Sequence, residues 1–319
     1  MRFSVVLILL ALASAACAQT FNEYPIPSRT IASNTCTSPD GLHVYFLANT
    51  YVDSIDMLGD IQEYPVPAPG LSAMTLVGCT FDPAGVMYFS DQTNHYFYSF
   101  DPSSLLFTYS KFPTPNVGIA GHAVNTDGLI YVMVTTNSAI QRVQPNGVFL
   151  PVIRLTAGRY PHGPSSCGGN VWFAENNANR VAFVTPAGSV SEFLLSVGGS
   201  HPFWTICAPD GGVYFTMETS NMIGRIDLTS YAIQYWKLPT ANSMPKGIAL
   251  LNDLLGNTSI CVAESNVNKI GCMPLGGGHI TEYLIPIAGA NPDKMASGPD
   301  GGVWFSQSTV SYMAELPPF

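Results

Sequence analysis

The sequence predicts an all-β protein, a seven-bladed β-propeller with four antiparallel strands in each blade. Strand-like segments recur along the chain with spacings of 43, 43, 41, 42, 47 and 43 residues, centred on Phe46, Phe89, Val132, Phe173, Phe215, Val262 and Phe305. The 319 residues include 29 Gly and 25 Pro but only 10% charged residues, which is typical of a turn-rich β protein and not of a disordered chain. A single repeat of short strands cannot bury its own faces, so the repeats must stack on one another.

Residues 1–18 have the pattern of a secretory signal. Arg2 precedes the apolar run 3–12, and the small residues Ala16-Cys17-Ala18 form a cleavage site before Gln19. No other stretch approaches the roughly 20 apolar residues that a membrane helix needs. We therefore expect a secreted protein, without a membrane span after cleavage, in which residues 19–319 form one propeller domain.

Each repeat contains the same succession of elements. A Pro-Asp-Gly-Gly turn such as 299–302 leads into an apolar strand, because Asp can cap its own backbone and Gly can take a positive φ. An Asn-containing turn and a third strand follow, as in 268–272. A fourth strand then ends near proline, as in 280–286, and proline suits an edge strand that needs no further N–H.

The N-terminus carries a fourth strand before any first strand. Residues 21–27 read Phe-Asn-Glu-Tyr-Pro-Ile-Pro, which matches the fourth strands of later repeats. The last repeat, 298–319, has inner strands but no fourth strand of its own. We therefore predict that the N-terminal strand closes the ring against the last blade.

Six cysteines remain after signal cleavage, and an even number in an oxidising compartment favours disulfides. Cys261 and Cys272 are symmetric about a predicted hairpin turn, so they should face each other and bond. Cys36 and Cys79 both lie ten residues before their repeat's marker and form a second predicted pair, which leaves Cys167 with Cys207. Asn257-Thr258-Ser259 is a glycosylation sequon in a long loop.

Charge and motifs exclude several functions. The net charge is −9 and the 12 Lys and Arg residues are scattered, so nothing resembles a nucleic-acid-binding stripe. There is no nucleophile elbow, zincin motif, phosphate loop or dinucleotide fingerprint. We expect a monomer that binds small apolar molecules.

Comparison of the blades selects the candidate site residues. A position that changes from blade to blade has no constant structural duty. After the proline that starts blades four to seven this position holds His162, Phe203, Lys246 and Asp293, and two residues after the marker it holds Glu175, Met217 and Glu264 in blades four to six. We expect both sets to face the central opening, with Lys246 opposite Glu264. The alternative interpretations are that His162 is a turn histidine hydrogen-bonded to the backbone, and that Glu175 and Glu264 are solvated carboxylates in the channel. Lys246 could be a surface lysine, and Phe203 and Trp204 could serve the packing between blades.

Several segments resemble the streptogramin (virginiamycin B) lyase family: Pro-Lys-Gly-Ile at 245–248, Gly-Pro-Asp-Gly-Gly-Val-Trp-Phe at 298–305, Asn-Lys-Ile-Gly at 268–271 and Ile-Thr-Glu-Tyr at 280–283. The resemblance covers essentially the whole mature chain. It implies a seven-bladed propeller and a magnesium-assisted elimination by His and Glu residues near the channel. The family's Pro-His-Gly and Trp-Phe-x-Glu pieces are intact only in blade four, as His162 and Glu175, and Tyr160 replaces a family glutamate. An oxygen-rich magnesium shell is therefore incomplete.

The chain is also similar to secreted fungal relatives of this family in its signal peptide, cysteines and apolar blade starts. Those relatives are hetero-Diels–Alderases that join a tropolone quinone methide to a humulene-type olefin, and this resemblance implies the same reaction without a metal cofactor. We expect catalytic roles for His162, Glu175 and Lys246. We expect substrate contacts from Tyr160, Phe203, Trp204, Met217, Glu264 and Asp293. The alternatives are a magnesium-dependent C–O lyase and a non-catalytic binding propeller.

Overall fold

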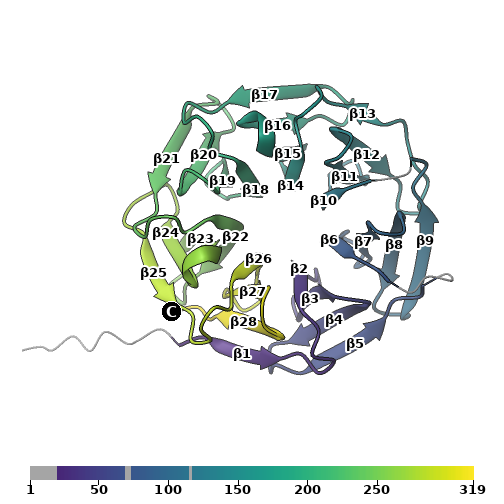
Figure 1. The fold of residues 1–319 in the computed structure, drawn as a ribbon, viewed down its shortest axis with the longest axis horizontal. Helices are drawn as coiled ribbons and strands as arrows, with labels where there is room; N and C mark the ends of the chain where they lie inside the picture. Colours follow the sequence, from purple (N-terminus) through teal and green to yellow (C-terminus); the bar gives the residue numbers. More distant parts are fainter. Residues whose placement is uncertain (1–19, 69–72, 115–116) are drawn as a thin grey trace, which may run out of the picture.

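The fold is a closed ring of seven four-stranded antiparallel sheets around a central channel (Figure 1). It was obtained as a computed structural model that describes residues 20–68, 73–114 and 117–319. In each blade the first strand lines the channel and the fourth lies at the outer edge. The predicted fold class is confirmed, because each repeat of about 43 residues forms one blade.

The strands of each blade follow one another along the chain, and their bounds are as follows. Blade one contains β2 (Ala32–Thr37), β3 (His43–Ala48), β4 (Tyr51–Asp56) and β5 (Ile61–Pro65), and blade two contains β6 (Leu76–Phe81), β7 (Met87–Asp91), β8 (Tyr96–Asp101) and β9 (Leu106–Lys111). Blade three contains β10 (Ile119–Val124), β11 (Ile130–Val134), β12 (Ala139–Val143) and β13 (Ile153–Arg154), and blade four contains β14 (Pro161–Cys167), β15 (Asn170–Glu175), β16 (Arg180–Val184) and β17 (Val190–Leu194). Blade five contains β18 (Pro202–Cys207), β19 (Gly212–Met217), β20 (Met222–Asp227) and β21 (Ile233–Lys237), and blade six contains β22 (Pro245–Asn252), β23 (Thr258–Glu264), β24 (Lys269–Pro274) and β25 (Thr281–Leu284). Blade seven contains β26 (Pro292–Ser297), β27 (Val303–Gln307) and β28 (Tyr312–Leu316), and two short 3-10 turns, η1 (Asn176–Ala178) and η2 (Ser265–Val267), follow β15 and β23.

The ring closes through the N-terminal strand β1 (Asn22–Pro25), as predicted. β1 pairs antiparallel with β28 and becomes the fourth strand of blade seven (Figure 1). Tyr24 stacks on Trp304, with ring centroids 5.2 Å apart, and the Gln307 amide donates a hydrogen bond to the Glu23 carboxylate. Backbone pairing and side-chain packing therefore both join the start of the chain to its end.

The core lies between the blades. The marker residues of the second strands are fully buried, among them Phe46, Phe89, Phe173, Phe215 and Phe305. Because side chains alternate along a strand, each second strand presents one face to the preceding blade and the other to the following one. The apolar clusters accordingly join neighbouring blades, such as three with four and four with five. No blade has a core of its own.

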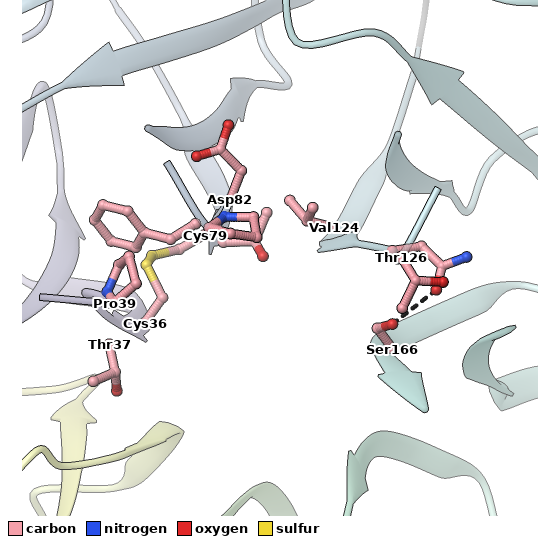
Figure 2. Close-up of a pocket in the computed structure, with 12 residues that line it drawn as sticks. Cys36, Thr37, Pro39, Cys79, Asp82, Val124, Thr126 and Ser166 are labelled. Atoms are coloured by element: carbon pink, nitrogen blue, oxygen red, sulfur yellow. Dashed lines mark hydrogen bonds between the residues drawn. A yellow bond between two sulfur atoms is a disulfide. The ribbon is translucent and has the colours of Figure 1, made fainter. Parts of the chain in front are cut away.

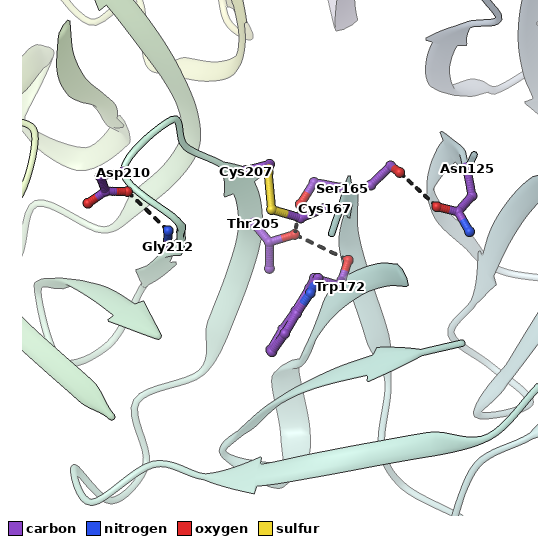
Figure 3. The surroundings of a disulfide bond; sticks show 9 residues. Asn125, Ser165, Cys167, Trp172, Thr205, Cys207, Asp210 and Gly212 are labelled. Carbon is purple, nitrogen blue, oxygen red and sulfur yellow. Dashed lines mark hydrogen bonds between the residues drawn. A yellow bond between two sulfur atoms is a disulfide. The ribbon is translucent and has the colours of Figure 1, made fainter. Parts of the chain in front are cut away.

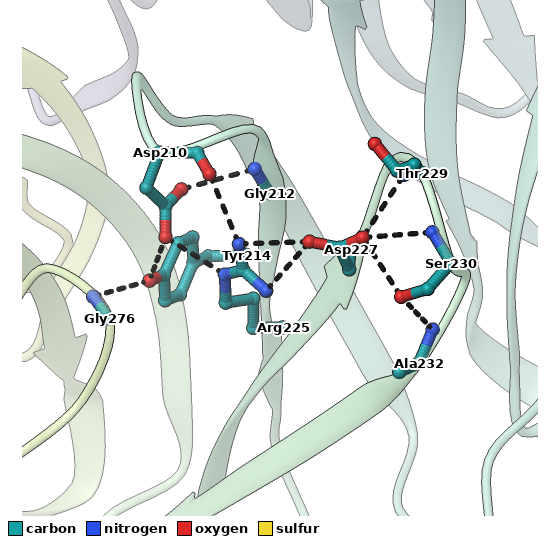
Figure 4. Close-up of polar contacts among 9 residues, drawn as sticks. All are labelled: Asp210, Gly212, Tyr214, Arg225, Asp227, Thr229, Ser230, Ala232 and Gly276. Atoms are coloured by element: carbon teal, nitrogen blue, oxygen red, sulfur yellow. Dashed lines mark hydrogen bonds and ion pairs between the residues drawn. The ribbon is translucent and has the colours of Figure 1, made fainter.

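Turn chemistry fixes the outer strands, and blade five shows how (Figure 4). Asp210, in the turn after the first strand, accepts hydrogen bonds from the Tyr214 hydroxyl and from Arg225 Nε, both at 2.9 Å. Asp227 then accepts backbone N–H bonds from Thr229 at 3.1 Å and Ser230 at 2.9 Å in the next turn. These contacts tie the second, third and fourth strands together.

All three predicted disulfides are confirmed: Cys36–Cys79, Cys167–Cys207 and Cys261–Cys272. The first two join the innermost strands of neighbouring blades, β2 with β6 and β14 with β18 (Figures 2 and 3). Beside Cys167–Cys207, the Thr205 hydroxyl lies 2.8 Å from the Ser165 hydroxyl and 3.3 Å from the Trp172 carbonyl oxygen (Figure 3). The third disulfide crosses between β23 and β24, where the two cysteines are direct partners in the ladder.

Two sequence predictions concern the ends and surface of the chain. The signal segment 1–18 lies outside the described residues. Within the described ranges, no helix has the length and apolar character required to cross a membrane. Asn257 is exposed in the turn between β22 and β23, and its amide donates to Asp253 at 2.8 Å.

Candidate functional site

One end of the central channel holds a cavity of about 210 Å³. We call it the channel-mouth cavity. Its wall comes from the first strands of blades one, two, three, four, five and seven, and from the turn after β7: Ser33, Asn34, Val77, Gln92, Ile119, Ala120, His162, Phe203, Trp204, Asp293 and Lys294. The lining is apolar on several sides, with one histidine and one carboxylate–lysine pair.

A β-bulge near the start of each first strand aims these side chains at the channel. In blade four the register shifts between His162 and Ser165, and in blade seven between Pro292 and Met295. Such a bulge leaves an N–H without a ladder partner. The hydroxyls of Thr216 and Ser306 on the second strands accept those N–H groups, from Trp204 at 3.2 Å and from Lys294 at 3.1 Å.

Glycine allows the first strands to approach closely enough to bring this lining together. Gly163 has a φ of +50°, and a Cβ built on it would lie 2.5 Å from the Phe203 carbonyl oxygen and from the Trp204 Cα. Any side chain here would push β14 away from β18. The Pro-His-Gly segment therefore has a structural reason for its glycine, and the histidine beside it is left to face the cavity.

Lys294 is held by two kinds of contact. Its ammonium nitrogen lies 2.9 Å from Asp293 Oδ1, 4.8 Å from the centroid of the Phe203 ring and 5.2 Å from that of Trp204. A cation this close to aromatic faces is attracted by their quadrupoles. Trp204 is the second residue after the proline that starts blade five, and Lys294 is the second residue after the proline that starts blade seven. The blade comparison selected Trp204 but missed Lys294, although the two positions correspond.

The electrostatics of the cavity favour a neutral histidine beside a charged pair. Burial, and then the positive charge of Lys294, lowers the pKa of His162 to about 4. Burial alone would raise the pKa of Asp293, but its contacts with Lys294 and the charge of Lys246 outweigh burial and lower it. His162 Nδ1 is buried away from solvent and has no hydrogen-bond partner among the described residues.

Glu175, Met217 and Glu264 do not face the channel, and the expectation that they do is wrong. All three are fully buried at the ends of second strands, in the seams between blades. Met217 packs in the core that blades four and five share. The residue type at this position varies from blade to blade because the side chain has a different local partner in each interface between blades.

The two buried glutamates show what those partners are. Glu175 lies 3.3 Å from Arg159, and burial and the charge of Glu192 raise its pKa to about 7. Glu264 lies over Gly271, on the side of the third strand, where burial and the charge of Glu282 raise its pKa to about 7. No ion pair joins Lys246 to Glu264 among the described residues, and the charged groups beside Glu264 are Glu282 and Lys269, so the predicted Lys246–Glu264 pair is not formed.

Lys246 and Tyr160 lie beside the cavity and do not line it. The charge of Lys246 acts on Glu218 and on Asp293 in the next blade. Tyr160 stacks beside His162, with centroids 6.1 Å apart. Its φ of +54° is shared by the corresponding His201, Met244 and Asn291, so this conformation belongs to the blade architecture.

The magnesium ion implied by the family does not fit these residues. Magnesium prefers oxygen ligands in an octahedral shell. The only carboxylate lining the cavity is Asp293, and Lys294 already occupies its Oδ1. Over 20–68, 73–114 and 117–319, no group of three or more His, Cys, Asp and Glu side chains is arranged to hold a metal ion.

The other end of the channel has a larger cavity of about 590 Å³, beside the Cys36–Cys79 disulfide (Figure 2). Several of its polar groups already have partners. Ser166 donates to Asn125 at 2.8 Å, and Asp82 accepts the Tyr88 hydroxyl at 2.8 Å. The channel mouth, with its neutral imidazole and held cation, is the better candidate for chemistry.

Solved structures of known proteins have the same fold. A streptogramin B lyase structure superposes with a TM-score of 0.83 at 24% identity, covering 93% of this chain and 96% of that one. Virginiamycin B lyase from Staphylococcus aureus gives a TM-score of 0.84 at 23% identity, covering 94% and 99%. A structure of a catalytically inactive histidine-to-alanine variant of that lyase with quinupristin gives the same values.

The similarity in sequence to a curated relative covers a smaller part of the chain than the similarity in structure. Virginiamycin B lyase from Nocardia farcinica is 31% identical over 87 residues, which is 27% of this chain and 31% of that protein. The aligned part thus spans about a third of that relative. The Virginiamycin B lyase family matches residues 78–316, well over half of the chain. The protein therefore belongs to the virginiamycin B lyase family of seven-bladed propellers.

Proposed function

We propose that the channel mouth binds an apolar, oxygen-bearing small molecule and joins it to an olefin in a hetero-Diels–Alder cycloaddition. The observation that carries the proposal is the Lys294 ammonium, which Asp293, Phe203 and Trp204 hold in place in a cavity whose wall is partly apolar. The resemblance to fungal propellers that join a tropolone quinone methide to a humulene-type olefin supplies the reaction class.

The reaction requires little acid–base chemistry from the protein. Three π bonds become one C–C σ bond, one C–O σ bond and one new π bond, and no proton, hydride or leaving group is transferred. When electrons flow from the olefin to the heterodiene, negative charge builds up on the heterodiene oxygen. Lys294 would donate to that oxygen and Phe203 would pack on the conjugated ring, so the proposed reaction uses no metal.

Positioning is the larger of the two contributions. Holding two reactants in a reactive geometry can contribute ~7 to 11 kcal/mol. One donor aimed at a developing oxyanion contributes ~2.7 to 4 kcal/mol. The rigid cavity wall of the closed ring therefore contributes more than any single residue. Lys294 chiefly stabilises the developing charge and orients the reactant.

We further propose that the mature chain is secreted as a glycosylated monomer. The segment 1–18 has the signal pattern, and the three disulfides are consistent with an oxidising compartment. Asn257 is exposed in its turn and open to modification.

The direct test uses protein purified from an oxidising host, humulene, and an ortho-quinone methide generated from a tropolone precursor. Products are resolved by chiral chromatography with mass detection. We expect one adduct stereoisomer, formed faster than in the protein-free control and at a rate that EDTA leaves unchanged. The stereoisomer mixture and rate of the protein-free control would contradict the proposal.

A second candidate is favoured by the neutral imidazole of His162, which lines the channel-mouth cavity. In an elimination that opens a cyclic ester, this imidazole would take the proton α to a carbonyl. The C–H electron pair forms the C=C bond, the C–O bond breaks and the carboxylate leaves. Virginiamycin B is the test substrate, and its ring opening by the wild type but not by His162→Gln would favour elimination over cycloaddition.

A further inference from the structure

We propose that a second cavity, which adjoins the channel mouth between blades one and two, is the subsite for the uncharged olefin. It holds about 470 Å³, and we call it the rim cavity. Arg29, Ile31, Ser33, Asn49, Met74 and Leu76 are among the residues that line it. The inference rests on the proposed function, because only a reaction of two molecules needs two subsites.

Size is the first argument. Small-molecule sites commonly occupy about 300–1,000 Å³. At about 210 Å³ the channel-mouth cavity falls below this range, whereas the rim cavity lies within it. The channel mouth alone is too small for both reactants, so one of them must extend into an adjoining space.

Continuity is the second argument. Ser33 lines both cavities, and Leu76 in the rim cavity directly precedes Val77 in the channel mouth. The Ser33 hydroxyl donates to the Leu47 carbonyl oxygen at 3.0 Å, so this shared wall is fixed and its donor is used. A ligand in the rim cavity therefore lies next to the channel mouth without a free donor between them.

The third argument is the chemistry of the walls. Met74 and Leu76 are buried and form an apolar floor, and Ile31 leaves 41% of its surface exposed beside them. The channel mouth instead carries the Asp293–Lys294 pair. Polar residues complete the rim-cavity wall, among them Arg29, Asn49 and Thr75, so a hydrocarbon is matched to the floor of Met74 and Leu76 and an oxygen-bearing reactant to the wall that carries Lys294. Met74 also suits this task because a thioether side chain adapts to irregular shapes.

Blade comparison adds a fourth argument. Ala32 pairs with Ala48 as Pro161 pairs with Glu175, so Ile31 occupies in blade one the position of Tyr160 in blade four. The corresponding residues in blades five to seven are His201, Met244 and Asn291. Blades four to seven share a positive φ at this position but no side-chain type, and blade one has there an exposed isoleucine that lines a cavity.

The test observes binding separately from catalysis. Protein labelled with [methyl-¹³C]methionine is titrated with humulene, and the Met74 resonance is assigned with Met74→Leu. We expect humulene to shift the Met74 resonance. Ile31→Trp, which fills the cavity, should weaken humulene binding at least ~10-fold and leave tropolone binding unchanged. Leu42→Trp is the matched control, since Leu42 is 60% exposed in the turn after β2 of the same blade.

The outcomes separate this inference from the proposed function. A Met74 resonance that humulene leaves in place, or wild-type humulene binding by a folded Ile31→Trp, overturns the subsite. If the adduct still forms in that case, the cycloaddition stands and only the subsite falls. A Met74 shift that Ile31→Trp abolishes supports the subsite even where no adduct forms, and the cycloaddition is then the part that fails.

Discussion

Lys294 is held in a fixed position by its neighbours. Its ammonium contacts one carboxylate oxygen and two aromatic faces, so the side chain cannot swing freely into the channel. A donor that is already oriented loses little entropy when charge develops beside it. His162 differs, because burial keeps its imidazole neutral and leaves Nδ1 without a partner. The same cavity thus offers one fixed cation and one neutral acceptor or donor.

The first prediction concerns Lys294→Met. Loss of the ammonium should lower kcat/KM for the cycloaddition by ~10²- to 10³-fold, the effect of removing one donor from a developing oxyanion. Steady-state kinetics check this, and Lys237→Met is the control because Lys237 is exposed on the outermost strand of blade five. Equal activities of the two variants would show that Lys294 does not touch the reacting oxygen.

The second prediction concerns His162 and acid stability. The native pKa of about 4 lies below the ordinary value of 6.5, so between these pH values the unfolded chain binds the proton and the native protein does not. Stability is therefore lost as pH falls from about 6.5 towards 4, by about 2 kcal/mol at pH 5. Urea unfolding at pH 7.5 and pH 5 should show a smaller loss for His162→Gln than for the wild type. An identical loss would mean that His162 is protonated in the native state.

At the scale of strands, the sequence predicted pairing well and side-chain direction poorly. The Phe-Asn-Glu-Tyr-Pro pattern revealed β1 as a fourth strand because its alternation and proline repeat in other blades. The direction of Glu175 was missed, since variation between blades shows only that a position lacks a common duty. Its actual partner, Arg159, lies in the preceding loop, and no periodic pattern connects the two.

The third prediction concerns Asp53 on β4, which is fully buried with no hydrogen-bond partner for either carboxylate oxygen among the described residues. Burial and the charge of Glu63 raise its pKa to about 8. The native protein then holds a proton between about pH 4 and pH 8 that the unfolded chain releases, so this contribution to stability falls as pH rises through that range. Asp53→Asn should raise the Tm at pH 8.5 by several degrees and at pH 5 by less. Asp60→Asn, on the exposed turn after β4, is the control and should leave the pH dependence of the Tm unchanged.

At the scale of the whole molecule, closure and cross-linking set the rigidity of the channel. β1 joins the two ends of the chain, and two disulfides join first strands at the end of the channel opposite the candidate site. The fourth-strand pattern of residues 21–27 predicted the closure, and the cysteine positions predicted the pairs, but the end of the channel at which the pairs lie was not predicted. The cavities could not be predicted in the same way, because they depend on how bulges from different blades converge.

The fourth prediction tests closure. Removal of residues 19–28 leaves β28 as an unpaired edge and exposes Trp304, which is 1% exposed in the intact ring. We expect the Tm to fall by more than 10 °C relative to the chain that begins at Gln19, since several buried contacts are lost together. Calorimetry measures this directly, and unchanged melting would sink the ring-closure interpretation.

The central claim is that chemistry occurs at the channel mouth and not at the disulfide end. The most direct measurement is a crystal structure of the wild-type protein with bound tropolone. The geometry predicts the ring of tropolone against Phe203 or Trp204, with its oxygen within hydrogen-bond distance of Lys294. Tropolone bound instead in the cavity beside Cys36–Cys79, with the channel mouth empty, would contradict it.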